Sequence, residues 1–528
     1  MDFDIVSLSR LQFALTALYH FIFVPLTLGL SILVAIMETV YVLTGRTLWR
    51  DMTKFWGGLF GINFAMGVAT GIVMEFQFGM NWSYYSHYVG DIFGAPLALE
   101  GLMAFFLEAT FVGLFFFGWE RLSRVKHLIV AWCVALGSNF SALWILIANG
   151  WMQNPVGAQF NPQTMRMEMT DFFAVLINPM AQTKFVHTVT AGYVTAAVFV
   201  LGISACYLLK GRYPALAKRS MTVAATFGLV SALALVALGD ESGYLVAKHQ
   251  KMKLAAMEAM WKTEPAPAAF TAFGFPDQAA RETHYAVHVP WLMGLIGTRS
   301  LTTEIAGIEA LVEQAERRIR DGLTAYDALQ HIRAASKTGA GIPPQAQADF
   351  ETHGHALGHA LLLKRYTDDP RQASPEQIRQ AAWDNVPQVA PLFWAFRLMV
   401  GLGVFLIVLT AVFSWLSIQR RLDAHRWLLK IAAYSIPLPW IAIECGWIVA
   451  ELGRQPWVIE GVLPTAVAVS NLGASTVLFT IIGFVLIYTA LLLIELKLML
   501  RAIRKGPDIA APDSADSRIT AATPAPAH

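Results

Sequence analysis

Ionisable side chains stand inside several long apolar runs of this sequence. Such a group is expensive to bury unless it has a partner, a proton or a ligand, so each one is a functional candidate by default. Imidazole and carboxylate groups are metal ligands, and a neutral carboxyl group can also pass protons on. The pattern alone predicts a membrane protein with a redox or transport function. The residues are His20, Glu75, Glu100, Glu108, His187, Arg397, Glu444 and Glu451.

The apolar runs that hold these residues are predicted to be membrane-spanning helices. The chain of 528 residues is 56% hydrophobic and only 14% charged, whereas soluble proteins carry about 25% charged residues. Runs of roughly 20 apolar residues are long enough to cross a bilayer. The net charge of +2 gives no reason to expect nucleic acid as a partner. We expect an all-α, polytopic fold with about nine spans, at 13–41, 55–78, 96–118, 128–148, 184–209, 219–239, 391–417, 428–451 and 471–500.

A polar stretch, residues 240–390, separates the sixth and seventh spans. It is too long for a simple connector and contains helical patterns such as 304–334, so we expect a large extramembrane loop with a function of its own. The chain then divides into 1–239 with helices one to six, the loop, 391–505 with helices seven to nine, and 506–528. This last segment is rich in Ala, Pro, Asp and Ser and is expected to be a disordered tail.

Lysine and arginine alternate between the two sides of the expected spans. The first, third, fifth and seventh connections between spans and the segment after the ninth span are rich in these residues. The second connection has none, the fourth has only Arg166 and the eighth only Arg454. Short cytoplasmic loops carry an excess of Lys and Arg. We therefore expect the odd-numbered connections and the C-terminus to be cytoplasmic, with the N-terminus and residues 240–390 outside.

This orientation places four possible metal ligands at one depth. His20, His187, Met399 and Glu451 all lie close to the outer end of their spans, as a cluster of cofactors at a common level requires. Each residue also has a plainer interpretation. A lone histidine can be a hydrogen-bond donor between helices, a methionine can fill the core, and a carboxylate at a helix end can anchor the helix at the interface.

Several motifs carry a family resemblance. Residues 446–457, Gly-Trp-Ile-Val-Ala-Glu-Leu-Gly-Arg-Gln-Pro-Trp, closely resemble the GWxxxExGRQPW signature of subunit I of cytochrome bd-type quinol oxidases of the long-loop type. The resemblance extends over about 1–505. The other matching motifs are Ser-Arg-Leu-Gln-Phe at 9–13, Tyr-His-Phe at 19–21, Asn-Gly-Trp-Met-Gln-Asn-Pro at 149–155 and Gly-Asp-Glu-Ser-Gly-Tyr at 239–244.

The resemblance implies ligands for three haem irons: two haem b, one low-spin and one high-spin, and one haem d. His187 and Met399 match the axial pair of the low-spin haem b, and two strong ligands suit electron transfer. His20 and Glu451 match the single protein ligands of the two high-spin haems, which keep a position open for oxygen. We favour His20 for haem d and Glu451 for the high-spin haem b, but the sequence leaves this assignment open.

Two further residues are implied to touch these cofactors. Arg397 lies two residues before Met399 and is expected to face a haem propionate or the charge of the reduced haem. Trp447 lies one turn before Glu451 on the same helix face and is expected to pack between cofactors. An ordinary interfacial tryptophan is the alternative for Trp447.

Two carboxylates on the third span match the proton relay of the family. Glu100 is at the haem level and Glu108 lies deeper, about 12 Å away along the helix axis. A buried, hydrogen-bonded structural pair is the alternative. Ser141, with Asn139, could continue the path on the fourth span. The weaker candidates are Glu75 and Glu444.

The long loop resembles the quinol-binding loop of the family. Lys253 and Glu258 match its functional positions, and a carboxylate acceptor beside an ammonium donor suits a hydroquinone that loses two protons. Without the resemblance they would be a solvated pair five residues apart. His353, His355 and His359 could suggest a metal site, but no Cys or carboxylate pattern accompanies them, so we do not favour one.

The implied activity is quinol:oxygen oxidoreduction in the inner membrane of a bacterium. Quinol, either ubiquinol or menaquinol, would be oxidised at the outer, periplasmic side, and O2 would be reduced to water with protons from the cytoplasm. This separates charge without pumping. The expected partners are subunit II, a small single-span subunit and membrane lipid.

Three other classes of protein compete with this interpretation. Only two of the 13 histidines, His20 and His187, lie in spans, which is too few for a haem–copper oxidase or for a dihaem cytochrome b. A secondary transporter would show internal repeats, and we find none in the sequence.

Overall fold

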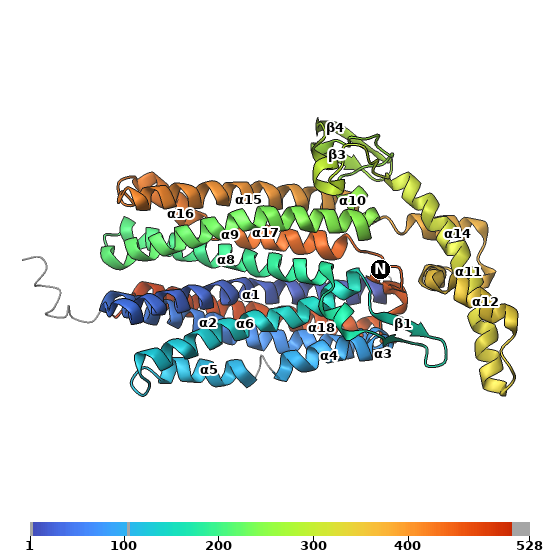
Figure 1. Ribbon diagram of the computed structural model, residues 1–528, viewed down its shortest axis with the longest axis horizontal. Coiled ribbons are helices and arrows are strands. Elements are labelled where there is room, and N and C mark those ends of the chain that lie inside the picture. The colour runs from blue at the N-terminus through green and yellow to red at the C-terminus, as the bar shows by residue number, and fades with distance from the viewer. Residues whose placement is uncertain (1–3, 103–105, 509–528) are drawn as a thin grey trace, which may run out of the picture.

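The computed structural model describes residues 4–102 and 106–508, which form a long helical bundle with a folded cap at one end (Figure 1). Among the described residues, eight helices are long and apolar enough to cross a membrane. The predicted all-helical membrane fold is confirmed, whereas the count of nine spans stays a prediction. The eight are α1 (Ile5–Thr44), α2 (Thr47–Met80), α6 (Arg124–Gln153), α7–α8 (Phe172–Leu209), α9 (Pro214–His249), α15 (Val389–Ile418), α16–α17 with a final π-turn (Arg426–Leu452) and α18 (Ala474–Lys505).

The expected third span is described in two helical segments. Helix α4 (Gly90–Glu100) and helix α5 (Phe106–Phe117) lie on either side of residues 103–105, which are outside the described part of the chain. Glu100 is the last residue of α4, and Glu108 lies in the first turn of α5.

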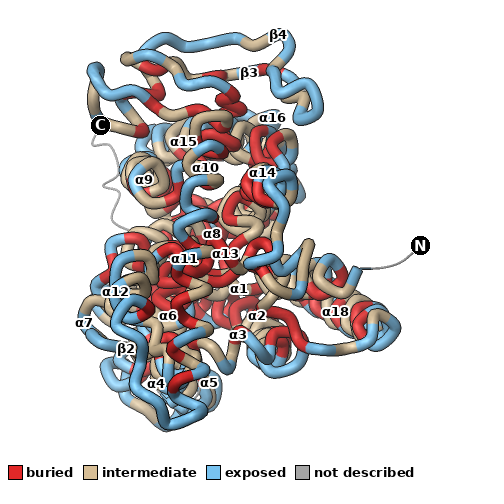
Figure 2. Tube along the Cα trace, turned by 90° about the vertical axis from the view of Figure 1, so that its right-hand side faces the viewer, coloured by how far each residue is buried: buried red, intermediate tan, exposed pale blue. Residues whose placement is uncertain are grey.

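Helices α1 and α8 form the centre of the bundle. They approach closely because glycines face each other: a Cβ added to Gly192 of α8 would lie 2.9 Å from the carbonyl oxygen of Pro25 in α1. Small residues allow this approach between membrane helices. Viewed along the bundle axis, α1 and α8 lie inside the bundle and α18 at its edge (Figure 2). The central helices thus provide rigid positions for His20 and His187.

The cap is built mainly from the expected loop. Helix α9 continues through His249, past the expected end of the sixth span at 239. The predicted helix at 304–334 is observed as α11. A separate hydrophobic core, which includes Ile308, Ile319 and Phe393, joins the cap to α15. The cap elements are α10 (Lys251–Met257), hairpin β3–β4 (Phe270–Asp277 and Glu282–Val289), α11 (Ile308–Thr338), α12 (Pro344–His353), α13 (Leu357–Leu361) and α14 (Pro375–Trp383).

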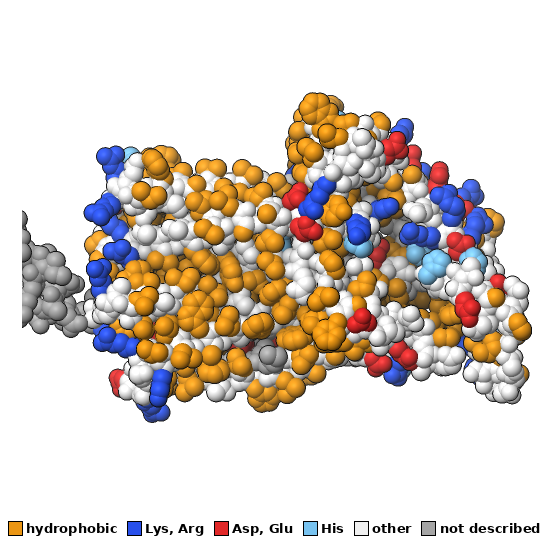
Figure 3. All heavy atoms as spheres, in the orientation of Figure 1, with side chains coloured by type: hydrophobic (Ala, Val, Ile, Leu, Met, Phe, Trp, Pro, Cys, Tyr) orange, Lys and Arg blue, Asp and Glu red, His pale blue; other side chains and the backbone are white. Residues whose placement is uncertain are grey.

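Short elements close the cap end of the bundle. Besides β3–β4, two further antiparallel hairpins are present, β1–β2 (Ala158–Asn161 and Arg166–Met169) and β5–β6 (Trp457–Ile459 and Leu463–Pro464). Helix α3 (Ser83–Tyr88) packs beside them. At the opposite end of the bundle, Lys and Arg side chains gather (Figure 3). The expected disordered tail falls almost wholly on residues 509–528, which lie outside the described residues.

Candidate functional site

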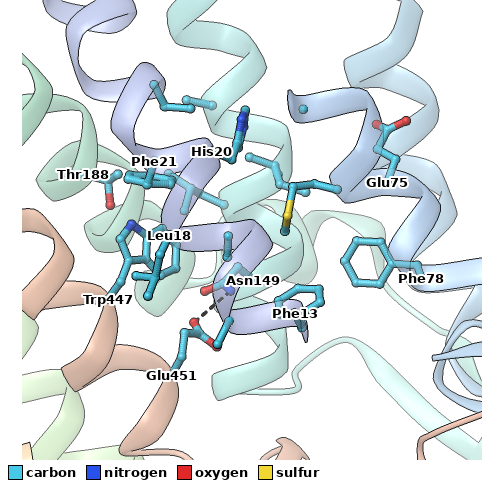
Figure 4. A pocket seen from close by; sticks show the side chains of 18 of the residues that line it. Phe13, Leu18, His20, Phe21, Glu75, Phe78, Asn149, Thr188, Trp447 and Glu451 are labelled. Carbon is cyan, nitrogen blue, oxygen red and sulfur yellow. Dashed lines mark hydrogen bonds between the residues drawn. The ribbon is translucent and has the colours of Figure 1, made fainter. Parts of the chain in front are cut away.

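A cavity of about 1200 Å³ lies inside the bundle near the cap. It exceeds the roughly 300–1,000 Å³ of ordinary small-molecule pockets, so it can hold bulky cofactors. Figure 4 shows His20 and the pair Trp447 and Glu451 at different places around this space, with Glu75 across from them. The cavity brings together seven residues singled out in the sequence: His20, Glu75, Glu100, Glu108, Ser141, Trp447 and Glu451.

The ring of His20 is oriented by Thr70 on α2. His20 Nδ1 and Thr70 Oγ1 are 2.9 Å apart, and Thr70 Oγ1 itself donates to the Met66 carbonyl at 3.0 Å. The hydroxyl must therefore accept from Nδ1–H, which leaves the lone pair on Nε2. A histidine that binds a metal through one nitrogen commonly donates its other N–H in this way. His20 is thus prepared as a ligand through Nε2.

The Glu451 carboxylate is surrounded by donors. It lies in the π-turn Ile448–Leu452 that ends α17, a local widening of the helix often found at functional sites. Asn149 Nδ2 donates to Oε1 at 3.1 Å, Arg454 Nε donates to Oε2 at 2.6 Å, and Lys184 Nζ is 3.6 Å from Oε1. These contacts fix a carboxylate at the wall of the cavity, where it can serve as an oxygen ligand.

Trp447 packs between Phe21, which lines the cavity, and Lys184. Its ring makes an edge contact with Phe21 at a centroid distance of 4.6 Å, and Lys184 Nζ lies 5.3 Å from its centroid. Lys184 was missed in the sequence, because it stands at the first position of an expected span and resembles an interfacial anchor. Asn149 was noted only as part of a motif. Its position on the same helix as Ser141 was the signal that could have identified it.

His187 and Met399 lie outside this cavity, among helices α8, α9, α15 and α17. Buried His187 Nδ1 has no hydrogen-bond partner within the described ranges. Glycines flank both residues: a Cβ on Gly239 would lie 3.8 Å from His187 Cε1, and one on Gly446 would lie 3.2 Å from Met399 Sδ. An unpartnered imidazole nitrogen and a thioether, each beside a glycine, fit a cofactor with two axial ligands.

Two carboxylates of the expected third span, Glu100 and Glu108, line the cavity. Glu100 Oε1 accepts from Ser141 Oγ at 2.8 Å, so this serine is in direct contact with the carboxylate. Glu108 is buried, and Ser138, which the sequence analysis did not select, lines the cavity with it. Asn139 does not join them, because its side chain bonds to the Ala135 carbonyl and to the Tyr193 hydroxyl.

Two other glutamates of the spans have contrasting positions. Glu75 lines the cavity beside Glu100. Both carboxylate oxygens of Glu444 are buried and lack a hydrogen-bond partner in the described part of the chain. Glu444 is not among the residues that line the cavity.

Lys253 and Glu258 belong to separate polar clusters. Lys253 Nζ donates to Gln250 Oε1 at 2.8 Å and to Gln153 Oε1 at 3.3 Å. Burial lowers the pKa of Lys253 to about 7. Gln153 also donates to Asn149 at 3.1 Å, so hydrogen bonds connect Lys253 with the Glu451 group. Neither residue is a solvated side chain, since both are almost completely buried.

Glu258 is paired with Arg397 of α15. Arg397 Nη2 donates to Glu258 Oε2 at 2.8 Å, and Nη1 donates to the Met257 carbonyl at 2.6 Å. The same guanidinium also donates to the Thr271 carbonyl of β3. Arg397 is thus directed to the cap rather than to the cavity. Burial raises the pKa of Glu258 to about 7, although the Arg397 charge opposes this rise.

The histidines of the later loop do not converge. His353 Nδ1 lies 3.7 Å from Asp321 Oδ1, and His359 packs against Trp457 at a centroid distance of 5.1 Å. Across residues 4–102 and 106–508, no group of three or more His, Cys, Asp or Glu side chains is arranged to hold a metal ion.

Sequence comparison decides the family. The family model described as cytochrome bd terminal oxidase subunit I matches residues 8–507. The chain belongs to this family. It is 52% identical over 504 residues to the cytochrome bd-II ubiquinol oxidase subunit 1 of Escherichia coli K12, covering 96% of this chain and 97% of that protein. It is 37% identical to the cytochrome bd ubiquinol oxidase subunit 1 of Bacillus subtilis 168, with coverage of 95% and 94%.

A solved structure agrees with this membership. The bd oxidase of Geobacillus thermodenitrificans superimposes with a TM-score of 0.76 at 26% identity, covering 96% of this chain and 99% of that one. The chain is therefore subunit I of a cytochrome bd terminal oxidase, a multi-pass protein of the inner membrane. Family membership implies haem cofactors and a subunit II partner.

Proposed function

We propose that this cytochrome bd subunit I oxidises quinol at its cap end and reduces O2 to water inside the bundle. The observation that carries the proposal is the shared cavity, whose lining includes His20, Glu451, Glu100 and Glu108. Possible ligands and possible proton carriers thus meet in one space. The substrate is ubiquinol or menaquinol, and a small single-span subunit joins subunit II in the complex.

The chain offers ligands for two haem b and one haem d. His187 and Met399 would hold the low-spin haem b, and His20 and Glu451 would each hold one high-spin haem. When bound, haem iron passes single electrons, and iron with one protein ligand can also take up and reduce oxygen. Thr70 supports this assignment, because its hydrogen bond directs the Nε2 lone pair of His20 away from Thr70.

Quinol oxidation requires two proton acceptors near the cap. Glu258 is the first, since its buried carboxylate has a pKa near 7 and can take a proton from a phenolic hydroxyl. Arg397 positions it through the 2.8 Å hydrogen bond. Lys253 acts from a separate cluster, where it holds Gln153 and Gln250 in place. We assign the second proton to the neutral amine of Lys253, since burial lowers its pKa to about 7.

Oxygen reduction requires protons at the cavity. Glu108 is a buried carboxyl group, and a group in that setting is favoured as neutral or paired. It would pass a proton along the cavity wall, past Ser138, to Glu100. Ser141 donates to Glu100 at 2.8 Å and holds the receiving carboxylate in place.

The two proton reactions would occur on opposite sides of the membrane. Lys and Arg side chains gather at the end of the bundle away from the cap (Figure 3), which favours a cytoplasmic location for that end. Quinol protons released at the periplasmic cap and protons taken from the cytoplasm would separate charge without pumping.

Quinol-dependent oxygen consumption by the purified complex tests this function. Glu258→Gln keeps the shape of the side chain but removes the acceptor, so we expect turnover to fall at least tenfold with normal haem content. Glu282→Gln in exposed β4 is the matched control and should leave turnover unchanged. Normal turnover in Glu258→Gln would exclude Glu258 as the acceptor, and a wild-type complex that consumes no oxygen with quinol would refute the proposed function.

A further inference from the structure

Hairpin β3–β4 and the turn after it expose large apolar side chains. We call Phe273, Phe275, Tyr285, Val287, Val289 and Trp291 the hairpin patch. Their exposed fractions range from 40% for Val289 to 84% for Tyr285. Contiguous apolar surface of this kind usually marks an interaction site.

The hairpin patch continues the apolar outer face of a membrane helix. The rings of Phe273 and Phe275 contact Trp394 near the start of α15, at centroid distances of 5.3 and 5.8 Å. Trp394 begins a row of exposed apolar residues that recur three, four or seven positions apart along α15, which is the spacing of one helix face. The row continues with Leu398, Phe405, Val408 and Trp415. The hairpin therefore extends the exposed apolar face of α15.

The neighbouring helix α9 marks where this apolar surface ends. Val230, Leu233 and Val236 are exposed and apolar. Directly after them, Asp240 and Glu241 both accept hydrogen bonds from Arg299, at 2.9 and 2.6 Å. This exposed charge cluster places the water boundary of α9 between residues 236 and 240. Arg299 follows the turn Gly294–Thr298. Gly294 N–H in this turn donates to the Ala268 carbonyl at 3.1 Å, two residues before β3, so the hairpin lies close to that boundary.

The hairpin has a polar side that is tied to the cap. Arg281, at its turn, stacks over the ring of Trp383 in α14 at 3.6 Å. In Figure 1 the hairpin projects sideways beside the end of α15. Figure 3 shows apolar side chains over the outer part of this projection and charged side chains on the side away from the bundle. The arrangement resembles elements that lie in the membrane interface, with an apolar face toward lipid.

We propose that the hairpin patch docks on the interfacial layer of the lipid bilayer. Tyr and Trp, here Tyr285, Trp291 and Trp394, are the side chains enriched at this depth, because their rings are apolar and their polar atoms reach water. A lipid surface suits the patch because it is continuous with the membrane face of α15 and ends at the charge cluster of α9.

This docking gives the hairpin a place in the proposed quinol reaction. The Thr271 carbonyl of β3 accepts from Arg397, which holds Glu258. The hairpin therefore stands between lipid and Glu258. A quinol dissolved in the bilayer would leave the bilayer at this place. This consequence rests on the proposed function, whereas the docking itself does not.

Fluorescence quenching of the complete complex in lipid nanodiscs tests the docking. Tyr285→Cys carries an environment-sensitive fluorophore, and the lipids carry nitroxides near the headgroup. The unsubstituted complex gives the background, because the native Cys133, Cys206 and Cys445 lie within spans. Glu313→Cys on exposed α11 is the matched control. Val287→Cys is a second label site if Tyr285→Cys fails to assemble.

We expect nitroxide lipids to reduce the emission from residue 285 at least twofold and to leave that from residue 313 unchanged. Iodide in the water should quench the label at residue 313 and leave the emission of the label at residue 285 largely unchanged. Quenching of residue 285 by iodide alone would overturn the proposal, because the patch would face water. Quenching by neither agent would also overturn it, because the patch would be covered by protein. These outcomes do not depend on turnover, so a failure of the docking and a failure of the proposed quinol chemistry remain distinguishable.

Discussion

The guanidinium of Arg397 and the carboxylate of Glu258 form a hydrogen-bonded ion pair, 2.8 Å between Nη2 and Oε2, at the junction of α15 and the cap. Glu258 is fully buried and Arg397 nearly so. Arg397 also donates to the carbonyls of Met257 and Thr271. One side chain thus joins α10 and β3 to a membrane helix that carries Met399.

Arg397→Gln should loosen the cap. Removing one partner of a buried pair costs on the order of 3–5 kcal/mol, because the other charge stays buried. We expect faster cleavage of the segment 258–290 in limited proteolysis and quinol turnover at least tenfold lower. Arg379→Gln, in an exposed ion pair with Glu376 on α14, is the control and should alter neither by more than about twofold. An unchanged proteolysis pattern in Arg397→Gln would show that the pair does not hold the cap.

Glu258 should give quinol oxidation a rising pH dependence. Burial raises its pKa to about 7, with Arg397 lowering it and Glu264 adding to the rise. A proton acceptor must be ionised, and the ionised fraction increases as the pH rises through about 7. We therefore expect kcat/KM for quinol to increase over this range. The Glu258→Gln variant should lose this rise of kcat/KM with pH. If the rise persisted in the variant, the titrating group would be another residue.

Thr70→Val should affect only the haem held by His20. Removing the acceptor of Nδ1–H frees the imidazole to rotate or to change tautomer, and loss of such a partner typically weakens metal binding 10–100-fold. The content of one high-spin haem should fall while the low-spin signal persists. Thr222→Val is the control, since its hydroxyl bonds to Ser417 at 2.7 Å, a contact between α9 and α15. Equal losses of all haem signals would indicate misfolding.

Glu108→Gln should slow oxygen reduction without removing haem. The amide keeps the shape and hydrogen bonding of the side chain but cannot carry a proton. We expect oxygen consumption to fall roughly a hundredfold, the scale of general acid–base catalysis, while quinol still reduces the haems. Glu495→Gln on α18 is the control, because Glu495 is also buried but does not line the cavity. Full turnover in Glu108→Gln would leave Glu108 as a structural residue.

The sequence was sufficient to predict that several cavity residues lie at the same depth in the membrane. Span boundaries and charge alternation placed His20 and Glu451 at one depth, and both line the cavity. Depth does not determine which neighbour a side chain touches, so Lys184 and Thr70 were missed. These contacts depend on the rotation of α8 and α2 about their axes, which hydropathy does not encode.

The loop residues show a different limit of sequence reasoning. Lys253 and Glu258 are five positions apart, and both were expected to act on the same hydroquinone. The structure separates them because Glu258 ends α10 and faces Arg397, whereas Lys253 packs toward Gln153 and Gly453. Their nearness in sequence carried no information about the tertiary partners of each residue, which come from α15 in one case and from α6 in the other.

The central claim is that this subunit carries haems held by His187, Met399, His20 and Glu451. The most direct test is the reduced-minus-oxidised visible spectrum of the purified complex, recorded for the unsubstituted protein and for Met399→Ala. We predict low-spin b, high-spin b and d features in the first and loss of the low-spin b feature alone in the second. A spectrum without haem features, or an unchanged low-spin feature in Met399→Ala, would contradict the account.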